Sequence, residues 1–399
     1  MSASAQALYT ILLVFTQKNV IINQNIVKED DNIGTFFNPL GMHRVGFSNP
    51  KDKELFESQK VNINKYISKY NSEARAKAKL DFCLLCKKQC SSFCNSHSVP
   101  QFALRRIAEN GKVHLSLQGE LPVLGDDLGV NKAGTFRVIC NKCDSDSFQD
   151  YEDPKAYQTT PTDKILSQIA LKNHLHEISK RLEEVEIYKL LSSQAPNLKD
   201  FFQSQENISQ LDLNEFYDEL NYAKKAILSK FNKNYHLCFF KVLDYVVPFS
   251  TQDEFALVSD FNDCIINNIY NTVPNYVIKY IHIAVFPLET TTVVMLFIKE
   301  GEKRYRDFYK QLNKLPLSEQ LSAINYIIFS YTENVYLSPS IHNQLKNNRN
   351  YMDVCRKTTI FESIFPISTN DGLSLATKEF SLSQRNKIPN LLSQEYSIK

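Results

Sequence analysis

The most concentrated chemistry in this sequence comes from cysteines. Two Cys-x-x-Cys pairs have 53 residues between them, and their four thiols are those of Cys83, Cys86, Cys140 and Cys143. Each pair can form a tight turn, and the intervening chain has only to return to its starting point for all four thiolates to bind one zinc ion. Because four thiolates leave the ion no open position, we expect this Zn²⁺ to be structural.

Two further thiols, Cys90 and Cys94, lie between the pairs. With Cys83 and Cys86 they could form a second grouping, and the spacing leaves open which four thiols bind the ion. Clustered Cys-x-x-Cys pairs in a chain of 399 residues indicate a reducing compartment and bound metal, not a disulfide framework. We therefore expect a cytoplasmic protein.

A histidine and several carboxylates lie close to these cysteines. His97 stands between the two pairs, Asp144 directly follows the second pair, and Glu152 comes eight residues later. A neutral imidazole can take a proton from water, and carboxylate oxygens suit a divalent ion. The candidate roles are a general base for His97, a ligand of catalytic Mg²⁺ or Mn²⁺ for Asp144, and a helper for Glu152. The alternative is that His97 is a zinc ligand or a core histidine.

Charge is unevenly distributed along this part of the chain. Lys and Arg outnumber Asp and Glu over 51–112, and the reverse holds over 113–163, although the formal charge of the whole chain is only +2. Any nucleic-acid surface must therefore be a local patch. Four basic residues are candidate phosphate contacts: Lys87, Lys88, Arg105 and Arg106. The alternative for the Lys-rich stretch that begins at residue 51 is that its charges form the solvated face of a helix.

The motif around His97 resembles a known family. Ser96-His97-Ser98-Val99-Pro100 is similar to the Asp/His-His-Ile/Val-x-Pro stretch of HNH (ββα-metal) endonucleases, and Cys140-x-x-Cys143-Asp144 is similar to their second zinc knuckle. With Phe148 and Glu152, the run also resembles poorly characterised bacterial HNH-like proteins. The resemblance covers about residues 80–190.

That resemblance implies both a fold and an activity. The fold is a ββα finger in which the histidine that ends the first strand deprotonates water. The activity is that of a metal-dependent endonuclease that hydrolyses phosphodiester bonds of nucleic acid, DNA in the first place. Restriction or bacterial phage defence is the role it implies, by analogy alone.

Three positions depart from the HNH pattern. Ser96 stands where many of these enzymes have Asp or His as an ion ligand, and Ser98 replaces an apolar residue. Ser147 and Phe148 stand where the second helix usually carries a His or Asn. The alternative function is therefore a zinc-stapled module that binds nucleic acid or a protein without cleaving it.

Short elements must position these side chains. The patterns predict a helix over 101–109 and strands over 112–118 and 135–139, the last of which leads into Cys140. A long helix is expected after Asp163. Its histidines, His174 and His176, are two residues apart and point in different directions on a helix, so we do not expect them to be metal ligands.

The remaining patterns indicate an α+β protein in three parts. Residues 1–80 form an N-terminal β and helical extension, 81–195 a zinc-binding HNH-like module with a trailing helix, and 196–399 a separate α+β domain of unknown role with an antiparallel sheet. This last domain is a candidate surface for homodimer formation or for a partner protein. Strands are expected over 235–247, 255–261, 277–286 and 292–299. The apolar stretch Ala7–Phe15 is too short to span a bilayer, so no membrane partner is expected.

Overall fold

The computed structural model describes residues 50–116, 127–194, 199–230, 233–271, 275–355 and 369–399, together with the single positions 196, 273 and 357. The β element expected in the first part of the chain falls within 1–49 and so lies outside these ranges. The rest of the chain is a mixture of helices and antiparallel sheets, which confirms the α+β class.

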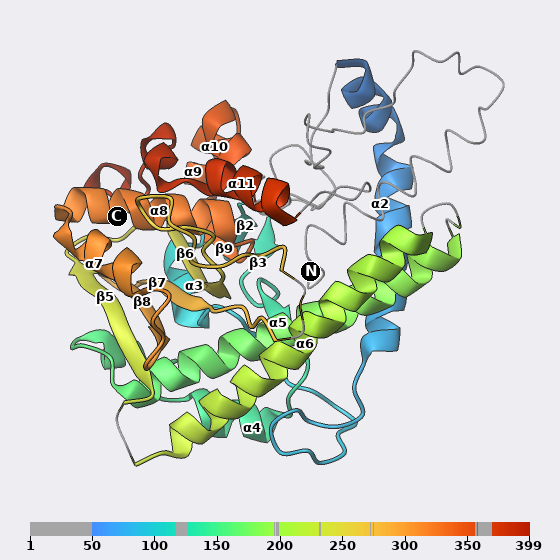
Figure 1. The fold of residues 1–399 in the computed structure, drawn as a ribbon, viewed down its shortest axis with the longest axis horizontal. Helices are drawn as coiled ribbons and strands as arrows, with labels where there is room; N and C mark the ends of the chain where they lie inside the picture. The colour runs from blue at the N-terminus through green and yellow to red at the C-terminus, as the bar shows by residue number, and fades with distance from the viewer. Residues whose placement is uncertain are drawn as a thin grey trace.

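A seven-stranded antiparallel sheet forms the centre of the fold (Figure 1). Its strand order is β3-β2-β9-β6-β7-β8-β5. The strands are β2 (Lys112–Leu115), β3 (Leu128–Gly129), β5 (Tyr235–Leu243), β6 (Phe249–Phe255), β7 (Ile281–Pro287), β8 (Thr292–Lys299) and β9 (Val335–Leu337). A separate two-stranded antiparallel pair joins β1 (Ser96–His97) to β4 (Thr135–Phe136).

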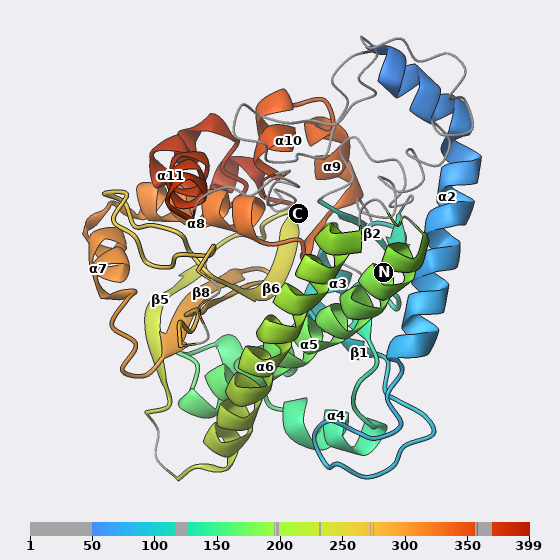
Figure 2. The same cartoon turned by 45° about the vertical axis from the view of Figure 1, so that its right-hand side comes forward.

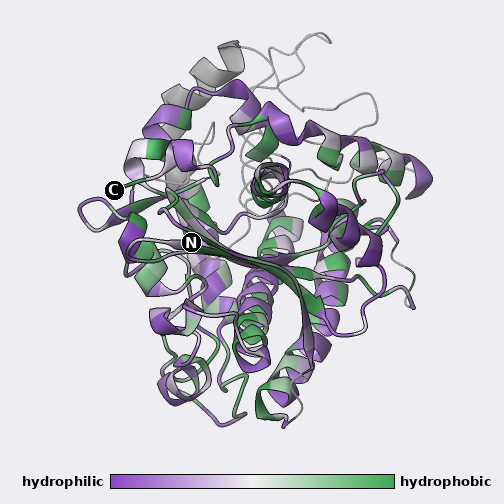
Figure 3. Cartoon of the chain, turned by 90° about the vertical axis from the view of Figure 1, so that its left-hand side faces the viewer, coloured by the Kyte–Doolittle hydropathy of each residue, from purple (hydrophilic) through white to green (hydrophobic). Residues whose placement is uncertain are grey.

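Helices cover both faces of the sheet, which Figure 3 shows close to edge-on. Side chains alternate between the faces of a strand. Ala284 and Phe286 of β7 accordingly pack in one apolar cluster with α5 and α6, whereas Ile283 and Val285 pack in another with α7 to α10. Because both faces are covered, β7 is buried along its whole length.

The helices fall into two groups along the chain. The first comprises α2 (Pro50–Ala78), α3 (Gln101–Ile107), α4 (Asn141–Phe148), α5 (Asp163–Gln194) and α6 (Lys199–Leu228). The second comprises α7 (Arg306–Lys314), α8 (Leu317–Tyr331), α9 (Pro339–Leu345), α10 (Arg349–Cys355) and α11 (Thr369–Phe380). Short 3-10 helices span Pro154–Tyr157, Leu382–Lys387 and Gln394–Tyr396. Among the described residues, no helix combines the length and apolarity needed to cross a membrane.

The sheet corrects one expectation about the C-terminal part. We expected 196–399 to carry a sheet of its own, yet β2 from the cysteine-rich part pairs with β9, His114 opposite Leu337. The backbone N–H of Ser340 also donates to Glu109 Oε1 at 3.0 Å. An edge strand left unpaired exposes backbone donors and acceptors, and here β2 and β3 cover that edge of β9. One sheet therefore crosses the predicted boundary between 195 and 196.

Helix α5 connects the cysteine-rich part to the sheet. The Asn173 side chain donates to the Asp253 carbonyl of β6 at 2.9 Å and accepts from Gln252 at 2.8 Å. Further along the helix, Arg181 forms an ion pair with Asp212 of α6 at 3.1 Å. These contacts tie α5 to both the sheet and α6, which fixes the rotation of the helix about its axis.

Candidate metal centre and histidine site

Four cysteines form the group that the spacing predicted. The Sγ atoms of Cys83, Cys86, Cys140 and Cys143 all lie within 4.8 Å of one another. The first pair lies in a turn closed by a 2.9 Å hydrogen bond from Lys87 N to Cys83 O. Lys87 adopts a positive φ of 59° there. The second pair begins α4, with Cys140 as its N-cap.

The donor set and its surroundings fit zinc. Thiolates about 2.3 Å from a tetrahedral ion are about 3.8 Å from one another, so the group has to contract only slightly. Burial opposes ionisation of Cys83, but backbone N–H groups of Cys86 and Cys140 prevail and lower its pKa to about 7. Cys140 N lies 3.3 Å from Cys83 Sγ. These residues could hold a structural Zn²⁺ ion, which would tie the turn to α4.

The question of which thiols group together is settled by their partners. Cys90 Sγ donates to the Ser92 carbonyl at 2.6 Å, and Cys94 Sγ donates to Asp144 Oδ2 at 3.4 Å. Neither thiol belongs to the group of four. Burial and the Asp144 charge raise the pKa of Cys94 to about 11, so this thiol is protonated and acts as a donor.

His97 lies on a two-stranded unit followed by a helix. His97 of β1 pairs with Thr135 of β4, and α4 begins five residues after β4 ends. The ring is half-buried, and Nε2 lies 3.2 Å from the Val130 carbonyl. Because a carbonyl only accepts, Nε2 carries the proton and Nδ1 holds the lone pair. Burial, then the charges of Lys172 and Arg105, lower the pKa of His97, so the ring is neutral at pH 7.

The centre of the site is a lysine that the sequence analysis missed. Lys172 of α5 places Nζ 2.8 Å from Ser96 Oγ, 3.1 Å from Asp144 Oδ1 and 3.2 Å from Glu152 Oε1. Its side chain is fully buried. Figure 2 shows how α5 passes β1 and α4, from which Ser96 and Asp144 come. We call Ser96, Asp144, Glu152 and Lys172 the lysine cluster.

The two carboxylates of the lysine cluster differ in environment. Asp144 is mostly buried, which opposes its ionisation, but Lys172 and the Ser96 hydroxyl, 2.6 Å away, together lower its pKa. Glu152 is 39% exposed. Burial, reinforced by the Asp144 charge and opposed by Lys172, raises the pKa of Glu152. Lys172 therefore brings the predicted residues Asp144 and Glu152 together, and the charges of Lys172 and Asp144 act on His97.

The arrangement does not fit the divalent ion that the resemblance implies. Mg²⁺ needs oxygen ligands at about 2.0–2.1 Å around an octahedral centre. Here the point between Asp144 and Glu152 is held by an ammonium nitrogen bonded to both.

The predicted phosphate contacts have different surroundings. Arg105 is exposed, and its charge acts on His97. Arg106 donates through Nε to the backbone carbonyls of Leu288 and Glu289 at 3.0 and 3.1 Å, so it anchors α3 to the turn after β7. Lys87 and Lys88 are exposed in the turn of the first cysteine pair.

The two histidines of α5 enter separate buried groups. His174 lies beside Glu254 and His282, and His176 beside Glu177 and Asp253. Both groups have side chains that could hold an ion. In the first, however, the Asn173 amide donates to His282 Nδ1 at 3.2 Å, which engages that lone pair. His174 and His176 thus point into different groups, as their spacing on a helix predicted, and whether either group binds an ion stays untested.

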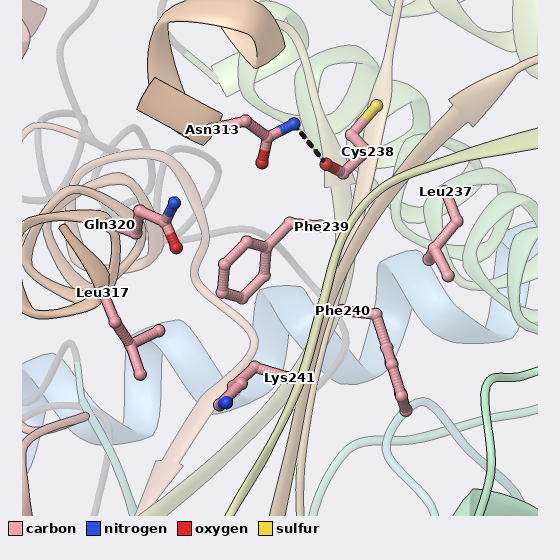
Figure 4. Close-up of a pocket in the computed structure, with 8 residues that line it drawn as sticks. All are labelled: Leu237, Cys238, Phe239, Phe240, Lys241, Asn313, Leu317 and Gln320. Atoms are coloured by element: carbon pink, nitrogen blue, oxygen red, sulfur yellow. Dashed lines mark hydrogen bonds between the residues drawn. The ribbon is translucent and has the colours of Figure 1, made fainter. Parts of the chain in front are cut away.

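A surface hollow lies at the other end of the sheet, between β5 and helices α7 and α8 (Figure 4). Asn313 crosses it to donate to the Cys238 carbonyl at 3.2 Å. Lys241 is the one charged side chain among the eight residues that line it. The hollow therefore has no grouping of acid, base or nucleophile comparable with the His97 site.

Comparisons of the chain with protein-family models, with curated proteins and with solved structures found no match.

Proposed function

We propose that the protein is a nuclease that hydrolyses phosphodiester bonds of nucleic acid, DNA before RNA, with His97 as general base. The observation that carries the proposal is the position of His97 on a strand pair that leads into α4, beside a four-cysteine group. Its ring is neutral, half-buried and held through Nε2, which leaves Nδ1 free of that bond to accept a proton.

In the proposed reaction, water attacks phosphorus and gives its proton to His97 Nδ1. The new O–P bond forms as the bond from phosphorus to the leaving oxygen breaks, and that oxygen takes a proton from solvent. Arg105, exposed and near enough to act on the His97 charge, is placed to bind the phosphate. Asp144 acts on the base through its charge, and Glu152 helps by holding Lys172, whose charge also acts on His97.

One observation favours a second candidate function, a zinc-stapled module that binds nucleic acid without cutting it. The ammonium of Lys172 is hydrogen-bonded to Asp144, the expected ligand of a catalytic ion, and to Glu152. Ser96, a poor ion ligand, stands beside it. For either function, the reduced four-thiol group supports a cytoplasmic protein. Restriction or phage defence is the role that the HNH resemblance implies. The domain boundary at 80 and a dimer through the C-terminal part stay predictions.

The deciding experiment compares the wild type with His97→Ala on supercoiled plasmid. We expect cleavage to fall by about 10²–10⁴-fold, the usual contribution of a general base. Zinc content, melting temperature and DNA affinity should stay near those of the wild type. His236→Ala is the matched control, because His236 lies on β5 at the far edge of the sheet.

Two results would contradict the proposal. A stable, zinc-loaded His97→Ala protein that cuts as fast as the wild type would remove His97 from the mechanism. A wild type that binds DNA but never cuts it would support the second candidate instead. Arg105→Ala should weaken DNA binding and lower its salt dependence by about one phosphate contact.

A further inference from the structure

We infer that the Lys172 ammonium takes the place of a divalent ion in this site, so that the lysine cluster does not bind Mg²⁺ or Mn²⁺. This inference deepens the proposed function, because it predicts that cleavage at His97 needs no added divalent ion. It rests on geometry that holds whether or not the protein cuts DNA.

The hydrogen bonds of Lys172 account for all of its donors. An ammonium group has three N–H bonds, and Nζ has three oxygen partners within 3.2 Å: Ser96 Oγ, Asp144 Oδ1 and Glu152 Oε1. The three oxygens come from three different segments: β1, α4 and the turn that follows α4. The cation therefore joins these segments, as a bound ion would.

Lys172 has no open route out of this position. Its side chain is fully buried, and Nζ lies 3.7 Å from the centre of the Phe148 ring. The next residue on α5, Asn173, is hydrogen-bonded to β6 through both ends of its amide. Withdrawing the ammonium would leave an unpaired charge inside the protein and two facing carboxylates without a cation, each of which is costly.

Ser96 fits an ammonium better than it fits an ion. Its hydroxyl accepts from Lys172 Nζ at 2.8 Å and donates to Asp144 Oδ1 at 2.6 Å. A carboxylate at this position would add a third negative charge, and a serine hydroxyl is a weak ligand for a divalent ion. The departure from the HNH pattern at Ser96 and the lysine at 172 are thus two parts of one arrangement.

The test measures Mn²⁺ binding by electron paramagnetic resonance, so its readout does not depend on activity. The zinc-loaded wild type is titrated beside Lys172→Met, which keeps the length of the side chain and removes its charge. Lys142→Met is the matched control: it removes an exposed ammonium paired with Asp146, two residues beyond Asp144. We expect the wild type and Lys142→Met to bind no Mn²⁺ in the range where Lys172→Met binds one ion per chain. Removing a positive charge next to two carboxylates should raise affinity by at least about 100-fold.

Tight binding of one Mn²⁺ by the wild type, lost in Asp144→Asn, would overturn the inference. A folded Lys172→Met protein that gains no Mn²⁺ site would overturn it too. If Lys172→Met does not fold, the wild-type titration still decides. The nuclease proposal can fail on its own. A wild type that does not bind Mn²⁺ and does not cut DNA would contradict the nuclease proposal and leave the assignment of Lys172 intact.

Discussion

Two neighbouring residues, Cys143 and Asp144, belong to groups that obtain their positive charge in opposite ways. Cys143 is one of four thiols that together are suited to zinc. In the described part of the chain, no basic side chain is hydrogen-bonded to them. Asp144 joins the lysine cluster, where the fold itself supplies a cation from α5. The difference teaches that ligand-type residues close to a metal knuckle do not by themselves predict a second ion. Whether a second ion can bind depends on which group occupies the space between those residues.

The largest expected effect concerns the dependence of the C-terminal part of the chain on the part that carries these two groups. A fragment of residues 200–399 should fail to fold stably, because it lacks β2 and β3 at one edge of the sheet and α5 on one face. Circular dichroism and denaturant titration of the fragment measure this. A cooperative unfolding transition like that of the whole chain would show that the cysteine-rich part is dispensable.

The zinc side of the comparison can be broken at one cysteine. Cys140→Ser should reduce zinc from about one ion per chain to none and unfold the region around 81–153, because ligation energy in such a site is folding energy. Cys90→Ser is the matched control, since that thiol lies outside the group of four. Metal analysis with hydrogen exchange provides the measurement. Equal loss of zinc in both variants would mean that a different set of thiols binds it.

The lysine side can be broken without metal. Lys172→Met should cost about 3 kcal/mol of unfolding free energy, because it removes one partner from a buried ion pair. Lys142→Met should cost less than about 1 kcal/mol, since its ion pair with Asp146 is exposed. Urea titrations of both variants test the contrast. If both variants lost similarly little unfolding free energy, the ion pairs of Lys172 would contribute no more than an exposed pair.

A glycine beneath β1 gives a smaller, sharply local effect. Gly134 has φ +63°, and a Cβ there would come within 2.5 Å of Ser98 Oγ and 2.8 Å of the Tyr336 hydroxyl oxygen. Gly134→Ala should therefore destabilise the protein by about 1–3 kcal/mol. Gly129→Ala meets nothing within 4 Å and should be close to neutral. Thermal melts of the pair would contradict this placement of β4 if the two variants behaved alike.

The smallest effect is a shift in pH dependence. As a base, His97 works only when neutral, so cleavage should rise with pH as the ring loses its proton and level off above it. The midpoint should lie below 6.5, because burial, Lys172 and Arg105 lower the pKa more than the Val130 carbonyl and Asp144 raise it. Lys172→Met should move the midpoint upward, since it removes a positive charge. A kcat/KM profile with no acid limb would contradict the assignment of the base.

The sequence predicted the parts of this site that depend on local spacing. The two cysteine pairs and the helix expected over 101–109 each depend on a pattern within a few residues, and the structure contains the four-thiol group and α3. Lys172 was missed because its partners lie 20 to 76 residues away in the chain. The available signal was a lysine directly after the apolar run Ile169-Ala170-Leu171 of α5.

The same reason explains the error in the sheet. We expected a strand over 255–261, but β6 spans Phe249–Phe255, and its central residues are Ser, Thr, Gln, Asp and Glu. This polar strand can be buried because its side chains have partners from distant parts of the chain. Among them, Asn173 and His174 of α5 pair with Gln252 and Glu254. Likewise, β9 has three residues, and nothing local in its sequence shows that β2 will pair with it.

The most direct test of the account is the dependence of cleavage on magnesium. Zinc-loaded protein, freed of other divalent ions on a chelating resin, is incubated with supercoiled plasmid over a range of Mg²⁺ concentrations from zero. We expect His97-dependent nicking at a rate that Mg²⁺ does not increase, because the ammonium of Lys172 leaves no site for that ion in the lysine cluster. Cleavage that is absent without Mg²⁺ and rises to saturation with it would contradict the account.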